Sequence, residues 1–294
     1  MIDRRRYALC LFLAPALTAI GLFFFLPVGA ALLLSFTDFD IYGLGNLSDV
    51  RFVGFRNYLQ IAQDPLFWIA LKNTLYFLCV GGPLSIAVSL GAALLLNQKL
   101  VRWKPLFRFA TFAPVVTTLV AVAVVWRFIY HPRFGLLNYL LSLAGVDPID
   151  WLGDPRWAMP AMILLAVWKN FGYNMIIFIA GLQNIPSTLY EAASIDGAGA
   201  WQQFRSITLP MLAPTTFFIT IITMIGYVQL FAEPYVMTQG GPMNSTLSIV
   251  LLMYQQGFRW WSMGYAAAIA FVLFLLILAV SVVQTRLQRE RANG

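Results

Sequence analysis

Long stretches of this sequence carry almost no charge, and they constrain the fold more than any other feature. Six apolar windows can be read along the chain, at about residues 7–36, 73–98, 109–126, 157–181, 206–232 and 260–285. A helix needs about 20 apolar residues to cross the hydrocarbon core of a bilayer. Helices and closed barrels are the structures that satisfy their own backbone hydrogen bonds in lipid. The windows therefore predict an all-α polytopic membrane protein with six transmembrane helices.

Composition leaves little room for anything else. Of the 294 residues 60% are hydrophobic and 11% are charged, whereas soluble domains carry about 25% charged residues. We therefore expect a single transmembrane domain over residues 1–294. The first window follows a basic start but is far longer than the 7–15 apolar residues of a signal peptide, so we interpret it as an uncleaved span.

The sequence contains few of the residue types that form catalytic sites and metal sites. The chain has one histidine, His131, and two cysteines, Cys10 and Cys79, both within apolar windows. Metal sites and disulfide frameworks need more ligands at closer spacing. The phosphate-binding pattern G-x-x-x-x-G-K-[ST] is missing from the sequence, so the chain cannot be an ATPase. We expect no catalytic residue, no metal ligand and no cofactor in this chain.

Lysine and arginine residues predict the orientation in the membrane, because they concentrate in cytoplasmic loops. With the N-terminus inside, the cytoplasmic set is Arg4, Arg5, Arg6, Lys99, Arg102, Lys104, Arg108, Arg205, Arg286, Arg289 and Arg291. The outer set is Arg51, Arg56, Arg133, Arg156 and Arg259, together with the acids Asp38, Asp40, Asp49, Asp64, Asp147, Asp150 and Asp154. The asymmetry predicts that both termini and the segment between the fourth and fifth windows are cytoplasmic.

That cytoplasmic segment is unusually polar for this chain. Residues 191–210 read EAASIDGAGAWQQFRSITLP. Pro186 suits a first helical turn and Ser187 is a possible cap, and the glycines that follow favour a turn because glycine tolerates left-handed dihedrals. A second short helix is expected to end at Leu209-Pro210, since the residue before proline disfavours helical dihedrals. The pattern predicts a surface helix–turn–helix, and by itself fits a connecting hairpin as well as a docking site.

Polar residues also interrupt the fourth window near its middle. Lys169 lies midway along residues 157–181, about 18 Å from either end at 1.5 Å per residue. A lysine at that depth costs about 2.5–3.5 kcal/mol on insertion scales. Lys169 shares a helix face with Tyr173, and Asn170 shares one with Asn174. Side chains of this kind usually face a cavity or a partner helix.

The fifth window carries a polar stripe at helical spacing. Its members are Thr216, Thr220, Thr223 and Tyr227, with Gly226 and Gln229 beside it and Glu233 at the outer end. Hydroxyls, amides and aromatic faces suit a polyhydroxylated solute. We therefore expect a substrate path along Lys169, Asn170, Tyr173, Thr220, Thr223, Gly226, Tyr227 and Gln229.

Structural explanations compete with this path. Threonines in spanning helices often bond their own backbone or a neighbouring helix, which applies above all to Thr216 and Thr220. Lys169 is equally explained by a structural ion pair, with Glu233 or with a partner subunit.

Several motifs resemble one known family. Glu191-Ala192-Ala193, Asp196-Gly197-Ala198, Phe204, Ile207 and Leu209-Pro210 resemble the EAA loop of ABC importer permeases. Residues 52–77, 238–246 and 258–270 resemble segments of sugar permeases of the maltose and glycerol-3-phosphate type. The resemblance covers nearly the whole chain and implies a type I importer permease core of six helices, with both termini cytoplasmic and the EAA loop at about residues 183–210.

The resemblance also implies how the protein works. It implies that the EAA loop sits in a groove of a cytoplasmic ATPase, which binds ATP and Mg²⁺. Glu191 would be the charged contact, while Asp196 and Gly197 would hold the turn and Asp196 would cap the second helix. The other coupling residues would be Ala192, Ala193, Ala198, Phe204, Leu209 and Pro210.

The implied assembly contains several further components. They are a second permease subunit, which makes a heterodimer, two copies of the ATPase and an extracellular or periplasmic solute-binding protein. The assembly would lie in the plasma (inner) membrane of a bacterium or archaeon, and no nucleic acid is expected as a partner.

Other functions stay open at this stage. A permease for glycerol-3-phosphate or another small polar solute is the main alternative, because Lys169 could bind an anion. An ion-coupled secondary transporter would show paired, interrupted spans in two similar halves, and no such repeat is visible in the sequence. An intramembrane enzyme would need a triad, a metal cluster or paired acids.

Overall fold

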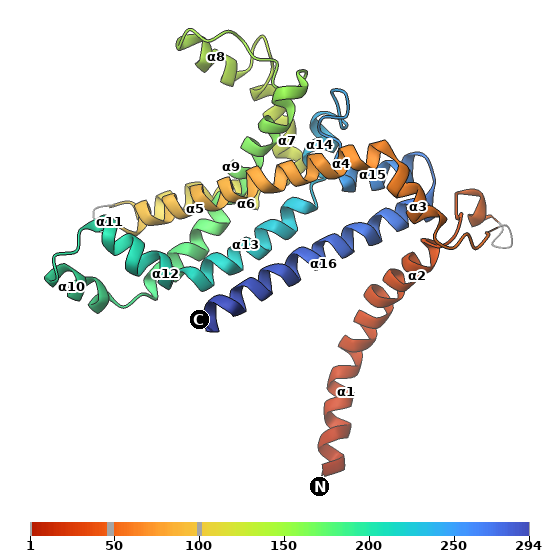
Figure 1. The fold of residues 1–294 in the computed structure, drawn as a ribbon, viewed down its shortest axis with the longest axis horizontal. Coiled ribbons are helices and arrows are strands. Elements are labelled where there is room, and N and C mark those ends of the chain that lie inside the picture. Colours follow the sequence, from red (N-terminus) through yellow and green to blue (C-terminus); the bar gives the residue numbers. More distant parts are fainter. Residues whose placement is uncertain (1, 46–49, 99–101, 294) are drawn as a thin grey trace. The chain divides into compact units, whose positions relative to one another are not determined.

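The computed structural model describes residues 2–45, 50–98 and 102–293, without the side chains of residues 2–10, 44 and 287–293. Lys99 and Asp49, which enter the orientation argument, lie outside the described residues, as do the side chains of Arg4, Arg5, Arg6, Arg289 and Arg291. Within these limits the chain is helical, with one isolated antiparallel bridge between Thr37 and Phe52 (Figure 1).

In the described ranges, five helices are long and apolar enough to cross a membrane. They are Leu11–Leu34, Pro65–Asn97, Pro155–Gln183, Ala213–Met237 and Met263–Arg286. A sixth candidate is the pair α6 (Lys104–Val116) and α7 (Leu119–Ile129), which is bent by 101°. The polytopic all-α prediction is confirmed, but the third window is a broken helix and not one straight span. The break falls at Thr117 and Thr118, whose backbones are extended.

Three helical stretches contain a π-helical turn at a corresponding place before a proline. The π segments η1 (Gly21–Phe25), η4 (Phe77–Gly81) and η5 (Phe204–Thr208) each end two residues before a proline, namely Pro27, Pro83 and Pro210. In an α-helix a proline clashes with the carbonyl four residues earlier and cannot donate the usual hydrogen bond. That carbonyl lies inside the π segment in each case, and the wider turn accommodates the proline without ending the helix.

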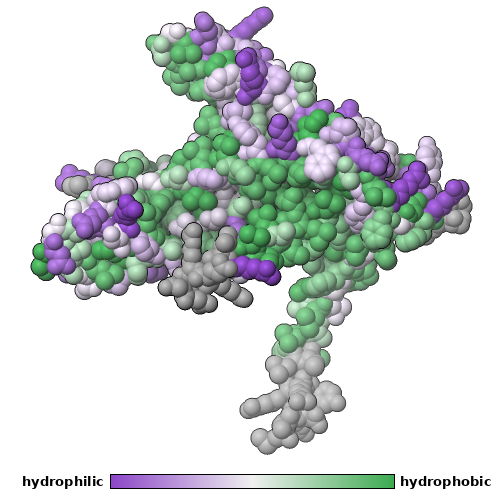
Figure 2. All heavy atoms as spheres, in the orientation of Figure 1, coloured by the Kyte–Doolittle hydropathy of each residue, from purple (hydrophilic) through white to green (hydrophobic). Residues whose placement is uncertain are grey.

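One compact unit consists of the residues up to Phe67 together with Leu252–Leu276. It contains α1 (Ile2–Ile20), α2 (Leu26–Leu34), η2 (Tyr42–Leu44), α3 (Arg56–Gln63), η6 (Gln255–Arg259) and the first part of α16 (Met263–Asn293). Asn57 is buried, and its amide donates to the carbonyl oxygens of Ser35 and Thr37, both at 2.8 Å. The Tyr265 hydroxyl donates to the Asp64 carboxylate at 2.9 Å. From residue 11 to the end of α2, the surface that is in view is apolar (Figure 2).

The second unit consists of Trp68–Leu251 and the residues from Ile277 onward. In it α5 (Gly82–Asn97) and α6 pack along α9 (Pro155–Gln183), α13 (Ala213–Val228) packs on α5 and α9, and α14 (Ala232–Met237) packs on α7. The unit also holds most of α4 (Pro65–Tyr76), α8 (Leu136–Leu143) and the start of α15 (Ile249–Tyr254). A buried core joins α5, α9 and α13 at one end, formed by Ala93, Leu96, Met175, Phe178, Ile179, Leu182, Ile185, Leu212 and Ile219.

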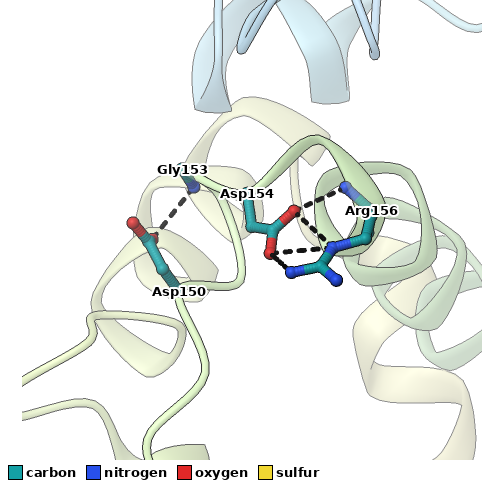
Figure 3. Close-up of polar contacts among 4 residues, drawn as sticks. All are labelled: Asp150, Gly153, Asp154 and Arg156. Carbon is teal, nitrogen blue, oxygen red and sulfur yellow. Dashed lines mark hydrogen bonds and ion pairs between the residues drawn. The ribbon is translucent and has the colours of Figure 1, made fainter.

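The start of α9 is fixed by its own loop (Figure 3). The Asp154 carboxylate is the N-cap and accepts from the Arg156 backbone N–H at 2.9 Å, and it also pairs with the Arg156 guanidinium at 2.9 Å. Both the guanidinium and the backbone N–H of Arg156 stabilise the charged carboxylate and lower the pKa of Asp154. Asp150 accepts in turn from the Gly153 N–H at 2.9 Å. A capped N-terminus of this kind satisfies helix N–H groups that would otherwise lack partners.

Candidate functional site

The predicted surface helix–turn–helix is present, and we call residues 183–210 the coupling segment. It contains α10 (Ser187–Ile195), a turn, α11 (Ala200–Gln203) and η5. Pro186 is the N-cap of α10, and no side-chain bond caps that helix, so the predicted cap at Ser187 is wrong. Ser187 is instead the first helical residue, because Pro186 already holds the non-helical backbone of a cap. Figure 2 shows polar side chains gathered at the α10–α11 end.

The turn between the two helices is a Schellman motif. The N–H of Ala198 donates to the carbonyl of Ala193 at 2.8 Å and that of Gly197 to Ser194 at 3.1 Å. Gly197 has φ +78°, a left-handed conformation that suits glycine at this position. Asp196 is the C-cap of α10, whereas the N-cap of α11 is Gly199 without a side-chain bond. The prediction that Asp196 caps the second helix is therefore wrong, because the turn is closed by backbone groups.

The second helix of the segment does not end at Leu209-Pro210 as predicted. It continues through η5 into α12 (Leu209–Met211), because the π turn accommodates Pro210. The fifth span accordingly starts at Ala213 and not at Ser206. The Tyr190 and Thr208 hydroxyls lie 2.9 Å apart and join α10 to η5.

The coupling segment is anchored to the helices behind it. Tyr190 and Ile207 pack on the buried core that joins α5, α9 and α13. Glu191, Ala192, Asp196, Gly197, Leu209 and Pro210 are exposed, and Ala193, Ala198 and Phe204 are half-buried. Trp201 is 72% exposed although its ring packs near Phe204, with 5.5 Å between the centroids. The segment thus has a fixed inner face and a free outer face.

A cavity of about 410 Å³ lies between α9, α13 and their neighbours in the second unit. Six of the predicted path residues line it: Asn170, Tyr173, Thr223, Gly226, Tyr227 and Gln229. The cavity is lined besides by Phe77, Val115, Leu119, Ala166, Asn174, Ile222, Leu230, Phe231, Ala232 and Glu233. Its wall is mostly apolar and aromatic, with a few amides and hydroxyls, which is the usual construction of a site for a small polar molecule. That the six predicted residues take part in transport stays a prediction.

The two remaining path residues lie outside the cavity lining. The Thr220 hydroxyl donates to the carbonyl of Thr216 at 2.7 Å, which is the backbone bond that spanning threonines often make. Lys169 is 8% exposed, and its ammonium donates to the carbonyls of Pro114 and Thr117, both at 2.9 Å. Those carbonyls belong to the last turn of α6 and to the break that follows it, so Lys169 holds this part of the third span against α9.

The packing of α9 on α6 agrees with this role for Lys169. A Cβ atom at Gly172 would overlap the carbonyl oxygen of Thr111, so the two helices approach closely there. The structure shows no ion pair between Lys169 and Glu233 within the described ranges. The sequence argument placed Lys169 in the substrate path and left a structural ion pair as an equal alternative, whereas the structure shows its ammonium bonded to backbone carbonyls.

Tyr227 is the most enclosed of the predicted path residues. It is 4% exposed, and its ring lies on Phe77 with 4.9 Å between the centroids. Its hydroxyl faces Ser85 and Asn170 without meeting hydrogen-bond geometry with either. A buried hydroxyl without a partner is costly, and one at a cavity wall is available to a bound molecule.

Several cavity residues escaped the sequence argument. Asn174 donates to the Thr223 hydroxyl at 3.1 Å and so joins α9 to α13; its face was noted, but its partner was not. Glu233 was placed at the end of the span, and it does lie near the end of the span Ala213–Met237, beyond a short interruption between α13, which ends at Val228, and α14. Gln229 to Phe231 form the break that a continuous helix would have hidden. Nothing in the sequence except its hydrophobicity distinguished Phe77, so its place in the cavity lining could not be predicted. Among the described residues no group of His, Cys, Asp and Glu could hold a metal ion.

Comparison with known proteins gives the family. Residues 85–293 match the family model described as "Binding-protein-dependent transport system inner membrane component". The chain is 40% identical to the lactose transport system permease protein LacF of Rhizobium radiobacter over 96% of this chain and 94% of that protein. It is 34% identical to the sulfoquinovosyl glycerol transport system permease protein SmoG of Agrobacterium fabrum, over 96% and 90% of the two chains.

A solved structure shares the fold. A chain of a bacterial alginate ABC transporter, solved with an alginate pentasaccharide-bound periplasmic protein, matches with a TM-score of 0.81 over 98% of this chain and 96% of that chain. At 23% identity this likeness shows the fold alone. The expected resemblance is confirmed, and it sets the chain among transport subunits and not among enzymes. The chain therefore belongs to the binding-protein-dependent transport system inner membrane components, the permease subunits of ABC importers.

Proposed function

We propose that this chain forms half of the translocation path of a carbohydrate importer and couples that path to a cytoplasmic ATPase. One observation carries the proposal: the coupling segment rests on the same buried core that joins α5, α9 and α13. The cavity lies farther along α9 and α13. A push on the exposed face of the segment is therefore transmitted to the helices that line the cavity, because a close-packed core is stiff.

The free face of the coupling segment fits a docking role. Glu191 is exposed and bonds to no other side chain in the described structure, while Ile195 is 86% and Trp201 72% exposed. An exposed apolar pair beside a free acid is a surface that a partner would cover. The partner is an ATPase that binds ATP and Mg²⁺, with Glu191 meeting a lysine or arginine on it.

The remaining components follow from the same assignment. A second permease subunit completes the path in a heterodimer, two ATPase copies take the two coupling segments, and a solute-binding protein delivers the carbohydrate from outside. Both termini and the coupling segment are cytoplasmic, in the plasma membrane of a bacterium or archaeon. The names of LacF and SmoG support a carbohydrate as the solute.

The test reverses one charge on the docking face. Glu191→Lys in the assembled transporter should keep the permease in the membrane but release the ATPase on purification and abolish uptake of radiolabelled lactose. The matched control is Asp147→Lys, which reverses an exposed acid in the loop before α9 and should leave both measurements unchanged. Normal ATPase copurification and normal uptake in Glu191→Lys would refute the docking role.

A further inference from the structure

The charge of the cavity is carried by one residue. Among the described residues that line it, Glu233 is the only acid, and no lysine or arginine is present. The other polar groups are the amides of Asn170, Asn174 and Gln229 and the hydroxyls of Thr223 and of the two tyrosines. A molecule in this cavity therefore meets one potential negative charge and no positive one at the wall.

The Glu233 carboxylate bonds to the backbone N–H of its own residue. It is 7% exposed, and within the described chain no other side chain donates a hydrogen bond to it. The nearby Tyr227 hydroxyl is buried without a partner. Buried polar groups are normally hydrogen-bonded, so this orphan hydroxyl at the wall that also holds the Glu233 carboxylate indicates that a ligand supplies bonds there.

The nearest basic residue cannot act as an anion site. The Lys169 ammonium is held by the carbonyls of Pro114 and Thr117 and is not part of the cavity wall. It forms no ion pair with Glu233 within the described residues. A solute in the cavity meets the carboxylate directly and meets the ammonium only through the wall.

We propose that Glu233 is a specificity-determining residue, which accepts hydrogen bonds from hydroxyl or amino groups of the solute and repels anions. The solutes that pass are then neutral or amino-bearing carbohydrates, and those with carboxylate, sulfonate or phosphate groups are disfavoured. The inference rests on the proposed function, in that the cavity is the solute path. It also separates this chain from a permease for a phosphorylated or sulfonated solute.

The electrostatic character of the cavity can be measured without knowing the solute. A Cβ atom at Gly226 meets no atom within 4 Å, so Gly226→Cys places a thiol in the cavity without displacing a neighbour. The native cysteines are replaced by Cys10→Ala and Cys79→Ala. The assembled transporter is then labelled with a cationic and an anionic methanethiosulfonate reagent of similar size, and the ratio of the two rates is recorded. Gly199→Cys, at another open glycine, is the control outside the cavity.

The expected result is a cationic preference at position 226 relative to position 199. It should fall several-fold in Glu233→Gln, because one unit charge at the wall attracts the cationic reagent and repels the anionic one, and it should persist in Glu233→Asp. Higher salt should also weaken it in the transporter that retains Glu233, which keeps the test valid if Glu233→Gln fails to assemble. Equal rates with Glu233 present, an unchanged ratio in Glu233→Gln, or no labelling at position 226 would each overturn the proposal. If the transporter that retains Glu233 shows the charge preference but takes up no carbohydrate, the result counts against the proposed function and not against the role of Glu233.

Discussion

Replacing Lys169 by methionine separates a structural lysine from a solute-binding one. Methionine keeps the length and the apolar stem of the side chain but removes the ammonium that donates to the Pro114 and Thr117 carbonyls at 2.9 Å. We expect the third span to be less firmly held against α9, and the protein to be less stable, while the cavity wall keeps its lining residues.

Two opposing terms set the size of the effect. A hydrogen bond from a charged donor contributes about 1.5–3 kcal/mol, so losing two destabilises by about 3–6 kcal/mol. Removing a lysine from membrane depth recovers about 2.5–3.5 kcal/mol of insertion cost. The central estimate is a net loss of about 1.5 kcal/mol, which lowers the melting temperature by roughly 3–6 °C for a chain of this size.

The measurement is a thermal unfolding curve of the purified protein in detergent, alongside carbohydrate uptake by the assembled transporter. Lys72→Met is the matched control, since Lys72 is exposed on α4, and it should leave the curve unchanged. Lys169→Met should lower the melting temperature and reduce uptake only in proportion to the folded fraction. A melting temperature equal to that of the native protein together with abolished uptake would refute the structural role and return Lys169 to the solute path.

Two further predictions concern the cavity wall and the turn of the coupling segment. Tyr227→Phe keeps the packing on Phe77 but removes a buried hydroxyl without a partner, so the melting temperature should stay or rise. Lactose uptake should meanwhile fall roughly two- to ten-fold, as the loss of a hydrogen bond of about 0.5–1.5 kcal/mol predicts; unchanged uptake kinetics would place the path elsewhere. Gly197→Ala forces a Cβ atom into φ +78°, which costs about 1–2 kcal/mol, and should weaken ATPase copurification. Gly91→Ala, at an open helical glycine, should not, and equal copurification in the two variants would contradict the role of the turn.

Local patterns predicted the elements whose cause is local. The apolar windows predicted the spans because a bilayer requires about 20 apolar residues, and the glycines of the coupling segment predicted its turn because Gly197 needs a left-handed backbone. The same reasoning wrongly ended a helix at Leu209-Pro210. It assumed an α-helical turn before Pro210, in which the proline ring would clash with the backbone. The turn before Pro210 is instead the π turn of η5, which is wide enough to accommodate the proline.

In the candidate site too, local patterns predicted some features and missed those that depend on tertiary contacts. Helical spacing placed Asn170, Tyr173, Thr223 and Tyr227 on faces that meet in one cavity, because the period of a helix fixes which residues share a face. Spacing could not tell which of the polar residues find partners. Thr220 turns to its own backbone, and Lys169 turns to the broken third span.

The sequence by itself determined that the chain is an all-α membrane protein, where its spans fall and that a polar helix–turn–helix joins the fourth and fifth. Those features depend on hydrophobicity and on interactions between residues a few positions apart. Only the tertiary structure decided that the third span breaks by 101° and that Lys169 caps the break. It also decided that the helix is interrupted after Val228 and that Glu233 is the one charged residue among those that line the cavity. Those outcomes depend on carbonyl and side-chain groups from helices about 50 or more residues apart, and a pattern within one helix carries no record of which distant groups will meet it.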